Sequence, residues 1–141
     1  MGMAAMPDLK PVVWIGSSKA DLSAFPEEVK DSMGFALYVA QLSGKHHSAK
    51  PLRGFGGAGI LEVVDEHESG TYRVVYAVQF PGRIYVLHAF QKKSKTGIKT
   101  PKAEISLIRS RLKSAGQEHG AWLKRQKGTV HDGEENRRSG R

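Results

Sequence analysis

The sequence predicts an α+β fold, with a small twisted sheet of about four mostly antiparallel strands, N-terminal helices and a C-terminal helix packed on it. Three observations carry this prediction. Apolar residues alternate in short runs through the middle of the chain, and they recur at helical spacing before and after these runs. Pro and Gly stand at most of the boundaries between these segments.

The first part of the chain is expected to hold one strand and two helices. Val12–Ile15 is a short apolar run, typical of a strand, and residues 18–25 are long enough for one or two helical turns. Pro26 suits the first position of a longer helix, which ends near Gly44. The apolar residues of this helix fall on one face, which predicts their burial: Val29, Met33, Ala36, Leu37 and Ala40.

The rest of the predicted domain begins with a loop at residues 45–59, rich in Lys, His and Gly. Three strands in antiparallel succession follow, the first two separated by a polar turn at residues 65–70. The strands are expected at residues 60–64, 72–80 and 84–90. Thr100 is a plausible N-cap and Pro101 a plausible first residue of the last helix, whose buried face would carry Ile105, Ile108 and Leu112.

Length and composition favour one domain at residues 12–114, between a flexible leader (1–11) and a polar extension (115–141) that is partly disordered. The end of the extension has too few apolar residues to offset the entropy cost of ordering. The absence of cysteine excludes disulfides and thiol chemistry. No apolar run approaches the roughly 18 residues that a membrane span requires, and the start does not resemble an export signal, so we expect a cytoplasmic protein without a membrane partner.

The positive charge of the chain is concentrated in one segment. Residues 83–113 contain nine Lys and Arg against one acid, Glu104, so the net charge of this segment equals the +8 of the whole chain. A cluster of this kind attracts polyanions such as nucleic-acid backbones. The alternative is a solubilising face, but the position directly after a buried strand favours a site.

Searches for cofactor and metal motifs are negative. The glycines of residues 54–59 do not form a P-loop or a dinucleotide-binding fingerprint, because no helix with a Lys-Ser/Thr follows them. His46 and His47 have no further ligands at a suitable spacing, so they are a weak metal signal. We therefore expect neither a cofactor nor a metal.

Four segments in one order carry a family resemblance. They are Pro26-Glu-Glu-Val, Lys50-Pro-Leu-Arg-Gly before a strand containing Glu62, Thr71-Tyr-Arg-Val-Val-Tyr, and Val86-Leu-His-Ala-Phe-Gln-Lys-Lys followed by Thr100-Pro-Lys-Ala-Glu-Ile. Together they cover roughly residues 12–113, and the last pair is the most specific. In this combination the chain resembles the RelE/ParE toxin superfamily, and within it the phage-derived HigB-like branch of type II toxin–antitoxin systems.

The resemblance implies a microbial RNase-like fold that cleaves messenger RNA, usually on the ribosome and without a metal, and a helix-turn-helix antitoxin as partner. Arg73 matches the family's sheet arginine, a phosphate clamp, and Lys92 and Lys93 match the basic pair after the last strand. Lys93 falls where many relatives carry a catalytic arginine. Further basic residues would hold the RNA backbone: Lys50, Arg53, Lys95, Lys99 and Lys102.

Three positions leave alternatives open. Glu62 replaces the lysines of better-known relatives; it is either a general base, if it shares a sheet face with Arg73, or an ion-pair partner that orients Arg73, which we favour. His88 is either a proton shuttle or, the reading we favour, a hydrogen-bonded core histidine. Tyr76 lies three residues from Arg73, so it points to the opposite face and is expected in the core.

Two other functions remain open at this stage. One is a ParE-like inhibitor without nuclease activity that binds a protein target such as gyrase, with the basic cluster as its contact surface. The other is a phage-derived nucleic-acid-binding protein that has lost catalysis.

Overall fold

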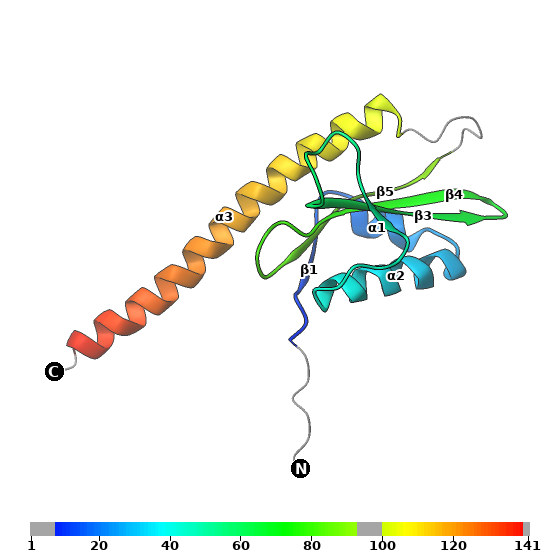
Figure 1. Ribbon diagram of the computed structural model, residues 1–141. Helices are drawn as coiled ribbons and strands as arrows, with labels where there is room; N and C mark the ends of the chain where they lie inside the picture. The colour runs from blue at the N-terminus through cyan, green and yellow to red at the C-terminus, as the bar shows by residue number, and fades with distance from the viewer. Residues whose placement is uncertain (1–7, 93–99, 140–141) are drawn as a thin grey trace, which may run out of the picture.

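The computed structural model describes residues 8–92 and 100–139, with side chains described up to residue 128. It is an α+β domain in which five strands form one mixed sheet (Figure 1). The elements in chain order are β1 (Val12–Trp14), α1 (Ser18–Ser23), α2 (Glu27–Gln41), β2 (Ala49–Pro51), β3 (Ile60–His67), β4 (Gly70–Ala77), β5 (Ile84–Lys92) and α3 (Lys102–Ser139). The predicted fold class is confirmed.

The sheet has the strand order β1-β5-β4-β3-β2. The predicted antiparallel succession of three strands is confirmed as β3, β4 and β5, whereas β1 pairs in parallel with the start of β5. β1 pairs with Ile84–Val86 at the start of β5, so the second half of β5 extends beyond β1. We call this second half the open half of β5.

The predicted number of strands was one too low, because β2 lies inside the expected loop at 45–59. It is a three-residue edge strand ending in Pro51, too short to show an alternating pattern. The expected polar turn at 65–70 is also shorter, since β3 continues to His67 and pairs with Gly70 of β4. β4 then ends at Ala77 rather than residue 80.

Helices cover both faces of the sheet (Figure 1). The predicted buried face of α2 is confirmed, and it packs with Val74 and Tyr76 of β4 in one apolar cluster. On the other face α3 packs against the sheet through Ile108 and Ala115, and Val75 and Leu87 complete that cluster. The predicted contact face of α3 is therefore correct.

Both prolines precede the helices that they were expected to begin. Pro26 is the N-cap of α2, and its carbonyl oxygen accepts the backbone hydrogen bond of Lys30. Pro101 likewise accepts the hydrogen bond of Ile105 at the start of α3, so Thr100, the expected N-cap, lies outside the helix. α3 continues to Ser139, so it crosses the boundary at residue 114 without a break; the domain division there stays a prediction.

Ala115 and His119 of α3 are buried beyond that boundary. His119 packs against Phe80, and its Nδ1 lies 3.0 Å from the hydroxyl of Tyr85. The first part of the predicted extension therefore packs on the sheet. No helix in the described part of the chain is long and apolar enough to cross a membrane.

Replacing Tyr76 with Phe is expected to raise the free energy of unfolding by about 1 kcal/mol. Tyr76 is fully buried, as predicted, and its hydroxyl has no hydrogen-bond partner among the described residues. Burial also raises the pKa of Tyr76 to about 12. The folded state thus holds this proton more tightly than the unfolded state, so wild-type stability falls as the pH rises from about 10 towards 12, and Tyr76→Phe removes that fall.

Urea denaturation of both proteins at pH 7 and at alkaline pH measures this expectation. A loss of about 1 kcal/mol or more in the variant at pH 7 would show that the hydroxyl makes a stabilising contact in solution.

Candidate functional site

The strand register gathers the predicted polar residues on the α3 side of the sheet. Lys50 of β2 lies opposite Glu62 of β3, and Glu62 and His88 both lie opposite Val75 of β4. Directly paired residues point to the same face of a sheet. Since Val75 packs in the α3-side cluster, the other three side chains also belong to that face.

The neighbouring cross-strand pairs extend the same surface. Arg73 pairs with Phe90, and Lys92 at the end of β5 pairs with Thr71. Successive residues alternate between faces, so Arg73 lies on the side of Val75. The register thus brings Arg73, Glu62, His88 and Lys92 to one face, and we call these four residues the sheet cluster.

A β-bulge places His88 on this face. The register shifts between Val75, which pairs with His88, and Tyr76, which pairs with Val86. Leu87 is the extra residue, and it packs in the α3-side cluster. Without the bulge, strict alternation would place His88 with Val86 on the opposite face.

Arg73 and Glu62 form an ion pair, with 3.2 Å between Arg73 Nη1 and Glu62 Oε2. The same nitrogen lies 3.3 Å from the hydroxyl oxygen of Thr100, to which it donates. Glu62 meets the condition set for a general base, because it shares a face with Arg73. The ion pair is the other role considered for it, and its function in catalysis stays a prediction.

His88 is hydrogen-bonded through both ring nitrogens. Nε2 contacts the carboxylate of Glu104, and Nδ1 lies 3.2 Å from Arg111 Nη1. A guanidinium has no acceptor, so Nδ1 accepts and Nε2 carries the proton that is donated to Glu104. The ring also stacks on Phe90, with centroids 4.7 Å apart. This is the arrangement of a hydrogen-bonded core histidine, and a shuttle role would require one of these bonds to open.

Arg111 was not among the predicted site residues, yet it connects three elements. Its Nη1 donates to the carbonyl of Leu87 at 3.0 Å, and its Nη2 donates to the Ser17 hydroxyl at 3.0 Å. Gly16 makes room for it, because a Cβ there would come within 2.8 Å of Arg111 Nε. The one available sequence signal was that Arg111 follows Glu104 by two helical turns, which puts both on the same face of α3.

Thr100 and the first turn of α3 lie over two members of the sheet cluster, because Thr100 contacts Arg73 and Glu104 contacts His88. Arg73, His88 and Lys92 are only 5%, 6% and 8% exposed. These three side chains are therefore inside the protein in this conformation, whereas the Glu62 side chain is 18% exposed.

The remaining predicted residues are more scattered. Lys50 in β2 lies on the same side of the sheet as Glu62 but is exposed, and Arg53 is exposed two residues after β2. Lys102 is exposed at the first position of α3. Lys93, Lys95 and Lys99 lie outside the described residues. Within the described part of the chain, no three His, Asp or Glu side chains are grouped as a metal site would require.

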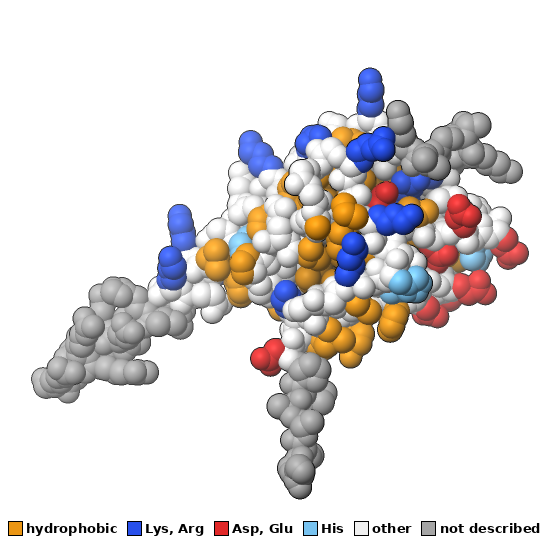
Figure 2. Space-filling model, viewed as in Figure 1, with side chains coloured by type: hydrophobic (Ala, Val, Ile, Leu, Met, Phe, Trp, Pro, Cys, Tyr) orange, Lys and Arg blue, Asp and Glu red, His pale blue; other side chains and the backbone are white. Residues whose placement is uncertain are grey.

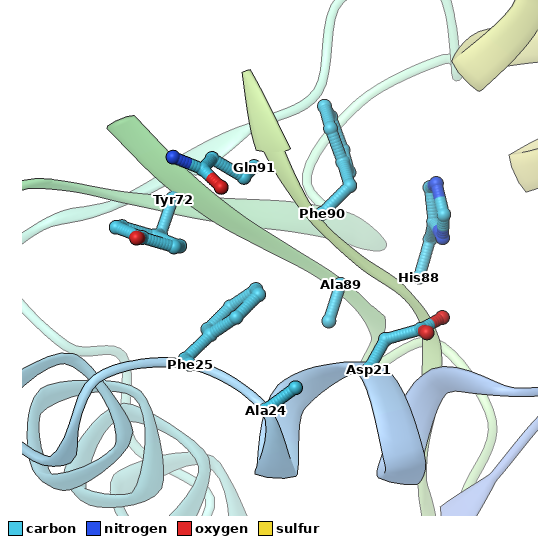
Figure 3. Close-up of a pocket in the computed structure, with 8 residues that line it drawn as sticks. All are labelled: Asp21, Ala24, Phe25, Tyr72, His88, Ala89, Phe90 and Gln91. Carbon is cyan, nitrogen blue, oxygen red and sulfur yellow. The ribbon is translucent and has the colours of Figure 1, made fainter. Parts of the chain in front are cut away.

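A cavity of about 380 Å³ lies across β5 from the sheet cluster. Phe25 and Ala89 point towards its space, whereas His88 and Phe90 project from the other side of the strand (Figure 3). Its full lining is Asp21, Ala24, Phe25, Tyr72, His88, Ala89, Phe90 and Gln91. The cavity is at the small end of the range for ligand pockets and adjoins the open half of β5.

The sequence model of the family described as "Phage derived protein Gp49-like (DUF891)" matches residues 20–113. The chain belongs to this Gp49-like family. The family is RelE-like and associated with toxin–antitoxin systems, which confirms the superfamily part of the resemblance. No curated protein matches the chain.

The match contains the whole sheet cluster and the start of α3, but it ends at residue 113. The part of α3 beyond that residue therefore lies outside the region that defines the Gp49-like family. Membership of a toxin–antitoxin family suggests an antitoxin as partner.

Proposed function

We propose that this Gp49-like chain is the toxin of a type II toxin–antitoxin system, of the HigB-like branch, and that it cleaves messenger RNA on the ribosome without a metal. The observation that carries the proposal is the sheet cluster, in which two cations, a carboxylate and a histidine share one face of the sheet. These are the groups that a metal-independent attack on a phosphodiester requires.

In the proposed reaction, the ribose 2′-hydroxyl attacks the adjacent phosphorus and the bond to the 5′-oxygen breaks. This step leaves a 2′,3′-cyclic phosphate and a 5′-hydroxyl. Arg73 would bind two phosphate oxygens in a bidentate manner, and the charge of Lys92 would stabilise the extra negative charge of the phosphorane. Lys93 would contribute in the same way from beyond the end of β5.

Glu62 is our preferred acceptor for the 2′-hydroxyl proton. It is held by Arg73 at 3.2 Å, so a phosphate that binds Arg73 competes with the carboxylate for the same guanidinium. The exchange would free a carboxylate oxygen next to the bound phosphate. Lys92 would donate a proton to the leaving 5′-oxygen, so that protons balance over the step.

Because Arg73, His88 and Lys92 are buried, we propose that RNA enters only after Thr100 and the start of α3 have moved. Thr100 contacts Arg73 and Glu104 contacts His88, so these two contacts must break before a phosphate reaches Arg73. We propose that this conformation is the resting form and that the ribosomal complex favours the open one. A helix-turn-helix antitoxin would keep the toxin inactive by covering the cluster or by preventing ribosome entry.

Controlled expression in a bacterial host, with mapping of messenger-RNA 5′ ends after induction, tests the proposal. We expect growth arrest and new cuts within translated codons, and we expect both to disappear in Lys92→Ala/Lys93→Ala. Lys19→Ala/Lys45→Ala removes the same charge from exposed positions outside the site and should leave both unchanged.

The other outcomes are equally informative. Growth arrest with intact messenger RNA would contradict the nuclease proposal and would favour an inhibitor of a protein target such as gyrase. Wild-type expression without arrest would indicate a nucleic-acid-binding protein without toxicity. Arrest and cuts that persist in the Lys92/Lys93 variant would show that the site is elsewhere.

A further inference from the structure

Five cations of α3 lie on one exposed stripe. At roughly 100° per residue they fall within an arc of about 60°, and at about 1.5 Å per residue they span about 38 Å. All five side chains are exposed. We call them the basic ridge: Lys102, Arg109, Lys113, Lys124 and Lys127.

The described acidic side chains of α3 point away from this stripe. Glu104 contacts His88, and Glu118 forms ion pairs with Arg83 at 3.6 Å and Arg125 at 3.4 Å. Neither acid neutralises the basic ridge. Solvated charged helix faces commonly alternate opposite charges, so a stripe of one sign is unusual for a merely solubilising surface.

Arg109 ties the basic ridge to the glycine-rich loop. Its guanidinium donates to the Gly54 carbonyl at 3.0 Å and lies 4.4 Å from the centre of the Phe55 ring. The middle of the ridge is therefore held in place on the domain, and the charges beyond it are presented by one continuous helix.

A glycine marks the gap between Lys113 and Lys124. Gly120 falls on the same stripe, where a Cβ would meet no atom within 4 Å. Packing within the domain therefore does not explain a glycine that costs a helix interior up to about 1 kcal/mol relative to alanine. The stripe is therefore open at Gly120, so an external backbone can approach the helix closely there.

On the face of the molecule seen in Figure 2, the charge is polarised. Lys and Arg side chains are spaced along the α3 side, and acidic side chains gather at the end formed by the β3–β4 hairpin and the start of α2. The contact face of α3 is already buried on the sheet through Ile108 and Ala115. Leu107 and Leu123, the large apolar side chains exposed on the described part of α3, lie about 160° apart around the helix, so they do not form the apolar face of a membrane-surface helix. A rigid polyanion fits this surface better than a lipid bilayer.

We propose that the basic ridge binds the phosphate backbone of folded, double-helical RNA. The ridge is separate from the sheet cluster, and its outer half lies beyond the family match, which ends at residue 113. The choice of RNA as the polyanion rests on the proposed function: the ridge would hold structured RNA near the strand that the cluster cleaves. A contact of this kind reads shape and charge, not base sequence.

Binding of a stable RNA hairpin by the full chain, followed by fluorescence anisotropy at several salt concentrations, tests the proposal. Lys113→Gln/Lys124→Gln/Lys127→Gln should lower affinity at least about tenfold near about 100 mM salt and reduce the magnitude of the log–log salt slope by about 2 to 3. Lys19→Gln/Lys30→Gln/Lys45→Gln removes the same charge from α1, α2 and a loop and should change affinity less than about twofold. Circular dichroism checks that both variants fold.

Equal losses in the two variants would overturn the proposal, because they would indicate a general effect of net charge. No loss in the ridge variant would overturn it as well. Tighter ridge-dependent binding of the matching DNA hairpin, or of anionic phosphatidylserine vesicles, would assign the surface to another occupant.

The cleavage proposal is tested separately, by mapping messenger-RNA 5′ ends after expression of the wild type. If the wild type binds the hairpin through the ridge but cleaves no messenger RNA, the ridge proposal stands and the nuclease proposal is contradicted.

Discussion

Arg73→Ala is expected to lower RNA cleavage by about 10²- to 10³-fold and to abolish growth arrest, the largest functional effect of any single change considered. Arg73 is the one guanidinium of the sheet cluster, and its ion pair with Glu62 fixes it at 3.2 Å from the carboxylate. Alanine removes the bidentate phosphate contact altogether. Arg73→Lys keeps the charge but not the planar fork, so it should recover only part of the activity.

The measurement has to separate loss of chemistry from loss of folding. Arg73 is buried, so its removal also leaves Glu62 without this ion-pair partner. Thermal unfolding of each variant quantifies that cost, and growth arrest together with 5′-end mapping reports the chemistry. Glu62→Gln is the matched change on the other side of the pair.

The two variants give different patterns under the two roles of Glu62. As a general base, Glu62 should be needed for turnover, so Glu62→Gln should lose cleavage at nearly unchanged RNA affinity. As an orienting partner, it should be partly replaceable by Gln, which can still accept a hydrogen bond from Arg73. Full cleavage in a folded Arg73→Ala variant would contradict the assignment of the site to this face.

The features of the fold that depend on local periodicity could be predicted from the sequence alone. Alternation along one strand predicted that Tyr76 and Arg73 point to opposite faces, and helical spacing predicted the buried faces of α2 and α3. The same rule placed Arg73 in the sheet without any knowledge of its neighbours. Whether Glu62 shares a sheet face with Arg73 could not be predicted from the sequence, because the register between two strands is set by the contacts between them.

Features that depend on contacts between distant segments were not predictable. The bulge at Leu87 turns His88 towards α3, and one extra residue in a strand leaves no mark in an apolar run. Arg111 reaches β5 from a helix 24 residues later in the chain, so its partners were invisible before the helix was placed. The short strand β2 lacked enough residues to show alternation.

Tyr85→Ala is expected to lower the free energy of unfolding by about 3–5 kcal/mol, the largest effect on stability. Tyr85 is fully buried, and its ring packs on Phe80 with centroids 5.2 Å apart. Its hydroxyl lies 3.0 Å from His119 Nδ1 and accepts from Arg83 Nη1 at 3.3 Å. Removal of the side chain leaves a cavity and takes away the hydrogen-bond partner of His119 Nδ1 between β5 and α3.

Urea denaturation followed by tryptophan fluorescence measures this loss. Trp122 is well placed as a reporter, because the Arg83 guanidinium lies 4.7 Å from the centre of its ring. Tyr85→Phe is the control: it keeps the ring and removes only the hydroxyl, so it should cost about 1–3 kcal/mol. Equal losses in the two variants would show that the hydrogen bonds, and not the packing of the ring, hold this part of α3 on the sheet.

The pH dependence of the same experiment tests the role of His119. Burial, and secondly the charge of Arg83, lower the pKa of His119, so the unfolded state binds its proton more readily than the folded state. Wild-type stability should therefore fall as the pH drops below about 6.5. In Tyr85→Ala the cavity admits water to His119, and its pKa should return towards the ordinary value. The stability gap between wild type and variant should then narrow on acidification; a gap that is constant from about pH 8 to about pH 5 would show that His119 stays buried without Tyr85.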